Sequence, residues 1–100
     1  RRFDPVAVGA MTFEPVRTEV FRAFRAGVEA GRTGGTAPAV FNAANEVAVA
    51  SFLAGGIAFG RIAEVIEQVL DVHRVEPVRE LDTVRAADRW ARAHAHEVLA

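Results

Sequence analysis

The chain has 100 residues, 51% of them hydrophobic, which fits one small domain or a domain with a piece of its neighbour. Its 12 basic and 13 acidic side chains give a net charge of −1, which argues against nucleic acid as a main partner, because phosphate binding needs a concentrated basic face. No cysteine is present, so disulfides and thiolate zinc sites are excluded, and we expect a cytoplasmic protein.

The N-terminal segment FDPVAVGAMTFEP, residues 3–15, is predicted to be extended. Val6, Val8 and Ala10 alternate with other side chains between two prolines. A single strand is not stable alone, and no second strand follows. We therefore expect residues 1–15 to be an extended linker or strand that pairs in an upstream domain, and residues 16–100 to form a helical domain.

The first helix is predicted over residues 16–31. Its apolar side chains fall on one face at helical spacing, and a glycine-rich turn, GRTGG, follows. The members of this face are Val20, Phe21, Phe24 and Val28.

The second helix has clear boundaries. Thr36 is a good N-cap, Pro38 suits the first turn, and Gly55 and Gly56 end the helix. Apolar residues cover most of its circumference, as in a helix surrounded by protein. We expect it to be the central helix of the domain.

Two more helices are predicted, over residues 61–73 and 82–98, joined by a connector that contains Pro77. The earlier one has the apolar stripe Ile62, Val65, Ile66, Val69 and Leu70. In the last one a second segment could start at Asp88. The expected buried set there is Leu81, Val84, Trp90, Ala91, Ala95 and Val98, with Trp90 as a core anchor. The fold class is therefore mainly α, a small four-helix bundle with an extended N-terminal arm.

The polar side chains of the central helix form the one unusual pattern. Asn42, Asn45 and Glu46 have the spacing i, i+3, i+4, so they share one face of an otherwise apolar helix. They could form a binding or acid–base site, or a structural polar seam that satisfies backbone groups nearby. We favour the structural seam, because one carboxylate without a nearby base or second acid is weak evidence for catalysis.

No other pattern indicates chemistry. His94 and His96 are two residues apart and cannot face each other on a helix, whereas His73 ends a helix, where an imidazolium interacts well with the dipole. The glycine pairs match no phosphate-binding loop. No segment is long enough to span a membrane, and the third helix has an acidic polar face, unsuited to anionic lipid. We therefore expect no catalytic, cofactor-binding or metal-ligating residue in this chain.

Residues 34–70 resemble the C-terminal region of the 1-deoxy-D-xylulose 5-phosphate reductoisomerase family. The specific motifs are NAANEVAV (42–49), FLAG (52–55) and I-x-F-x-x-I (57–62). GAMTFEP (9–15) is similar to the link out of the family's catalytic domain, and AADRWARAHA (86–95) to its closing helix. The chain departs from the family at EPVRTEVF, where a Pro-Asp and a Phe-Pro step are usual.

The resemblance implies an enzyme that converts 1-deoxy-D-xylulose 5-phosphate to 2-C-methyl-D-erythritol 4-phosphate in the non-mevalonate isoprenoid pathway. It implies NADPH and a divalent cation (Mg or Mn) as cofactors, and a homodimer with NADPH-binding, catalytic and C-terminal helical domains. The nucleotide, metal and substrate residues lie upstream, so none is carried over to this chain. This 100-residue chain alone should be inactive, and its polar seam should dock against neighbouring backbone.

A free-standing helical protein-interaction module is the alternative. Such a module would bind a partner in an apolar groove and would exist as a chain of 10.8 kDa. The native mass of the polypeptide that carries this segment separates the two hypotheses.

Overall fold

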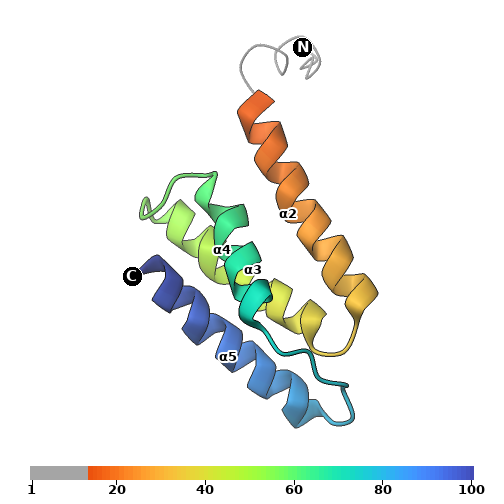
Figure 1. Ribbon diagram of the computed structural model, residues 1–100. Coiled ribbons are helices and arrows are strands. Elements are labelled where there is room, and N and C mark those ends of the chain that lie inside the picture. The colour runs from red at the N-terminus through yellow and green to blue at the C-terminus, as the bar shows by residue number, and fades with distance from the viewer. Residues whose placement is uncertain (1–13) are drawn as a thin grey trace, which may run out of the picture.

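The computed structural model describes residues 14–100. They form four helices, α2 (Glu14–Thr33), α3 (Ala37–Leu53), α4 (Arg61–Val72) and α5 (Leu81–Leu99), and this part of the chain contains no strand (Figure 1). The predicted mainly α four-helix bundle is confirmed. The extended segment predicted at 1–15 lies outside the described residues, except for Glu14 and Pro15, which begin α2.

Helix α3 is the centre of the bundle, as its sequence predicts. It packs against α2, α4 and α5, whereas α2 and α5 make no contact with each other over the described residues. In Figure 1, α3 and α4 lie between α2 on one side and α5 on the other. The helix ends at a glycine turn in which Gly55 has a φ of 82°.

The core combines branched side chains with many alanines. The largest fully buried apolar side chains are Ile66, Val40, Val65 and Val69, which confirms the predicted stripe of α4. Ala91 and Ala95 of α5 are completely buried where α5 crosses α3. Small side chains let two helix backbones approach closely, so this contact depends on shape as well as on apolar area.

Helix α5 differs from its prediction in two ways. It is continuous, without a break at Asp88. Trp90 is 38% exposed and Leu81 60% exposed, so the prediction that they belong to the core was wrong. The buried face of α5 consists of alanines, Ala87, Ala91 and Ala95, because only small residues fit where the helix lies closest to its neighbours.

Helix α2 is attached by small residues. Ala26 and Ala30 are buried, and Gly27 faces the ring of Phe41 on α3 so closely that a Cβ would lie 2.9 Å from it. The larger residues predicted to form its apolar face are not in the core: Phe21 is 57% exposed and Phe24 68% exposed. Helical periodicity identifies an apolar face but does not specify what covers it.

Candidate functional site

The polar residues of α3 lie on the surface, at the edge that faces α5. Glu46 is the centre of this polar cluster: it accepts a hydrogen bond from Asn42 Nδ2 at 3.0 Å and from Arg92 Nη2 of α5 at 2.8 Å. Arg92 Nε also donates to Asp88 Oδ2 at 2.8 Å. The cluster therefore joins α3 to α5 through side chains 46 positions apart in sequence.

The contacts within this cluster favour the charged forms of Glu46 and Arg92. The hydrogen bond from Arg92 and, next, that from Asn42 lower the pKa of Glu46 below its ordinary value. The bonds to Asp88 and Glu46 raise the pKa of Arg92. A carboxylate that stays ionised near neutral pH cannot serve as a general acid, so the cluster is suited to holding helices together or to binding.

Two of the three predicted seam residues come together directly. Asn42 and Glu46 bond to each other, and Arg92 is the partner that sequence reasoning missed, since no local pattern links α3 to α5. Asn45 is half-buried on the same side of α3, and its side chain makes no hydrogen bond to the described residues. Its amide group is therefore open to a partner beyond residues 14–100.

A second group of polar contacts, which the sequence did not predict, connects the α2–α3 turn to the connector after α4. Thr36 is completely buried, and its Oγ1 lies 2.8 Å from His73 Nε2 and accepts the backbone N–H of Glu76 at 3.0 Å. In return the backbone N–H of Thr36 donates to the Glu76 carbonyl at 2.9 Å. Thr36 does occupy the N-cap position of α3, but its side chain does not cap the helix because these tertiary bonds engage it.

His73 behaves differently from the prediction based on the helix dipole. Burial lowers its pKa, and the opposing influence of Glu76 is smaller, so the neutral ring is favoured. The indole of Trp90 contacts two imidazoles: it is stacked on His94 with ring centroids 5.2 Å apart and tilted against His73 at 5.4 Å. The one hydroxyl beside His73, that of Thr36, is completely buried and already accepts the Glu76 backbone N–H, so this group of contacts is suited to a structural role.

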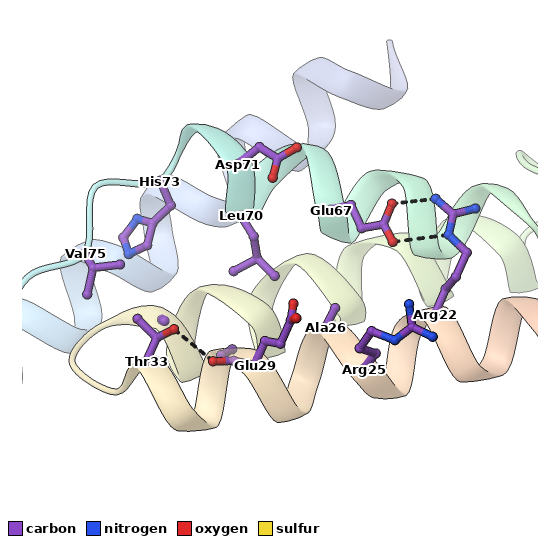
Figure 2. A pocket seen from close by; sticks show the side chains of 12 residues that line it. Arg22, Arg25, Ala26, Glu29, Thr33, Glu67, Leu70, Asp71, His73 and Val75 are labelled. Carbon is purple, nitrogen blue, oxygen red and sulfur yellow. Dashed lines mark hydrogen bonds and ion pairs between the residues drawn. The ribbon is translucent and has the colours of Figure 1, made fainter.

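A groove of about 230 Å³ runs between α2 and α4 (Figure 2). Arg22 and Arg25 line one end, and Glu29 and Asp71 lie farther along it. Arg22 is already engaged, because its Nε and Nη2 donate to both oxygens of Glu67, and this pairing raises its pKa. The groove has mixed charge, so it lacks the concentrated basic surface of a phosphate site.

Within residues 14–100, no group of three or more His, Cys, Asp or Glu side chains is placed to hold a metal ion. The same part of the chain contains no helix that is both long and apolar enough to cross a membrane.

The chain matches the family model described as the DXP reductoisomerase C-terminal domain over residues 1–94. The 1-deoxy-D-xylulose 5-phosphate reductoisomerase of Halothermothrix orenii is 43% identical over 98% of this chain and 26% of its own length. That of Symbiobacterium thermophilum is 49% identical over 94% of this chain and 24% of its own length. The chain thus spans about a quarter of the length of the curated relatives it matches.

A solved structure shows the same arrangement. The 1-deoxy-D-xylulose 5-phosphate reductoisomerase of Zymomonas mobilis, in complex with NADPH, superimposes with a TM-score of 0.71 at 40% identity. The match covers 75% of this chain and 20% of that one. Sequence, family model and helical arrangement agree, and the chain belongs to the 1-deoxy-D-xylulose 5-phosphate reductoisomerase family, where it corresponds to the C-terminal domain.

Proposed function

We propose that this chain is the C-terminal helical domain of an NADPH- and divalent-metal-dependent 1-deoxy-D-xylulose 5-phosphate reductoisomerase, and that it supports the catalytic domain without contributing a catalytic residue. The observation that carries the proposal is the match of nearly the whole chain to about a quarter of each relative. We extend the proposal to a homodimeric, cytoplasmic enzyme, on the basis of the family resemblance.

The glycine turn before α3 does not fit the pyrophosphate of NADPH. The glycine turn before α3 follows a helix, whereas a dinucleotide-binding turn follows a strand. The backbone N–H groups of Thr36 and Ala37 at this helix start already donate to the carbonyls of Glu76 and Gly34, at 2.9 and 3.1 Å. They are therefore not free to bind a pyrophosphate.

The polar cluster does not fit a divalent cation either, because its two carboxylates, Glu46 and Asp88, are both paired with Arg92. These two observations support the proposal that both cofactors are held by the preceding part of the polypeptide.

The test is an activity measurement on the complete polypeptide that contains this segment. NADPH oxidation should depend on 1-deoxy-D-xylulose 5-phosphate and on added Mg²⁺ or Mn²⁺, and it should be absent for the 100-residue chain alone. Absence of turnover by the complete polypeptide, or turnover by the short chain, would contradict the proposal.

We also propose that Asn42, Asn45 and Glu46 form a structural seam toward the neighbouring domain. Support comes from their location on one side of α3 and from the Asn45 amide, which has no partner within the described residues. The Arg92 and Asn42 bonds hold the Glu46 carboxylate in a fixed orientation. A fixed acceptor beside an open amide suits recognition of backbone groups.

The alternative function, a free-standing interaction module, draws support from the exposed phenylalanines of α2. Such a module would have a native mass of 10.8 kDa. A native polypeptide several times heavier, like the relatives, would exclude it.

A further inference from the structure

The outward side of α2 is an apolar surface without a partner among residues 14–100. We call it the α2 face; its members are Val20, Phe21, Phe24 and Val28. The two phenylalanines are more than half exposed, and they line a shallow hollow with Arg25 and Val28. Large apolar side chains on one helix face normally pack against protein, so this face is suited to contact with another apolar surface.

Contacts made by the opposite side of α2 determine that the α2 face points away from the bundle. Arg22 donates through two nitrogens to the Glu67 carboxylate on α4. Gly27 packs under the Phe41 ring of α3. These contacts prevent α2 from rotating about its axis to bury the phenylalanines in the bundle. Figure 1 also shows the N-terminal end of α2 projecting past the other helices.

We propose that the α2 face docks onto an apolar surface of the preceding part of the same polypeptide. This inference rests on the proposed function, since the relatives are about four times as long as the segment they share with this chain. Helix α2 is the first helix of the described residues, so it is the one joined most directly to that preceding part.

The size of the α2 face favours this tethered occupant over a second copy of the chain. A phenylalanine covers about 150–250 Å² when buried, so two that are 57% and 68% exposed present roughly 200–300 Å². Even with the two valines, this is well below the ~800 Å² per partner of a stable interface. A tethered surface needs less area, because its effective concentration is on the order of millimolar.

These 100 residues contain no cysteine, so a cysteine introduced here is the only thiol in its segment and can be followed by its own peptide. Val20→Cys places a thiol in the α2 face and leaves both phenylalanines intact, and Leu81→Cys provides a control at an exposed apolar residue on another helix. Each variant is made in the complete polypeptide and treated with a maleimide, and the modified peptide is quantified by mass spectrometry. The rate in the native state is compared with the rate after unfolding.

We expect the thiol of the Val20→Cys variant to react roughly tenfold or more slowly in the native than in the unfolded polypeptide, and that of the Leu81→Cys variant to react at similar rates in both. Adding Phe21→Ser and Phe24→Ser should speed the native reaction at position 20. The proposal is overturned if the native thiol at position 20 reacts as freely as the one at position 81, or if the serine changes leave its protection intact. It is also overturned if protection disappears on dilution from micromolar to nanomolar protein, since the occupant would then be a second copy.

The comparison of Val20→Cys with Leu81→Cys leaves both phenylalanines in place. It therefore decides the proposal even if the variant with the two serines does not fold. NADPH oxidation with 1-deoxy-D-xylulose 5-phosphate is measured on the same preparations. Turnover with an unprotected thiol at position 20 would refute only the docking face. Protection of that thiol without turnover by the parent polypeptide would refute only the proposed activity.

Discussion

Thr36 Oγ1 lies 2.8 Å from His73 Nε2, although 37 positions separate the two residues. The same oxygen accepts the backbone N–H of Glu76, and the lowered pKa of His73 favours the neutral ring. We therefore assign the Thr36 proton to the bond with Nε2 and the ring proton to Nδ1. One buried hydroxyl thus joins the end of α4 and its connector to the turn before α3.

Thr36→Val keeps the shape of the side chain and removes the hydroxyl. His73 Nε2 and the Glu76 N–H then lose their partner, so we expect a loss of about 1–3 kcal/mol in the free energy of unfolding. Urea denaturation followed by circular dichroism measures it. The control is Thr33→Val, because the Thr33 hydroxyl bonds Glu29 at an exposed site. Equal losses for the two variants would contradict the role given to Thr36.

The stability of the chain should depend on pH through His73. Its pKa is lower in the folded chain than in the unfolded chain, so unfolding takes up a proton. The contribution is complete above the unfolded pKa of about 6.5 and is lost as pH falls through that value toward the folded pKa. His73→Gln should flatten this part of the profile of unfolding free energy against pH, whereas His96→Gln, at an exposed site, should not. A profile unchanged by His73→Gln would exclude this linkage.

Gly35 and Gly31 should respond to alanine in opposite directions. Gly35 has a φ of 57°, and a Cβ there would clash with the Glu76 carbonyl oxygen, so Gly35→Ala should cost about 1–3 kcal/mol. Gly31 lies within α2, where a Cβ would meet nothing within 4 Å. Gly31→Ala should therefore stabilise the chain by about 0.5–1 kcal/mol. Thermal unfolding of both variants tests the pair, and shifts of the same sign would refute the argument.

The alanine contact between α3 and α5 should not tolerate larger side chains. Ala91 is completely buried, so Ala91→Leu should lower the free energy of unfolding by about 1–3 kcal/mol through overpacking. Ala93 lies on the exposed side of the same helix, and Ala93→Leu should leave stability nearly unchanged. Denaturant titrations compare the two. A neutral Ala91→Leu would mean that α5 can shift away from α3 without cost.

The proposed seam predicts an effect that depends on the preceding domains. Asn45→Ala and Glu46→Ala should lower the thermal midpoint of the complete polypeptide more than that of the 100-residue chain, because the seam residues would lose partners outside the bundle. Gln68→Ala, at an exposed site on α4, is the control. Unchanged stability and unchanged NADPH turnover in the complete polypeptide would rule out the seam.

Much of the fold could be predicted because local rules determine it. Pro38 and Gly55 mark the ends of α3, and the stripe that includes Val65 and Ile66 identifies the buried side of α4. The resemblance carried by NAANEVAV led to the family that the comparisons establish. Each of these signals lies within a few neighbouring residues, where helix geometry fixes which side chains share a face.

Only the tertiary structure decided which apolar faces are covered and which polar groups meet. Phe24 and Trp90 have the chemistry of core residues, yet both are exposed, because alanines occupy the close helix contacts. Arg92 reaches Glu46 over 46 positions, and Thr36 reaches His73 over 37. The physical reason is that periodicity assigns a side chain to a face of its own helix, whereas the neighbour of that face depends on how all the helices pack together.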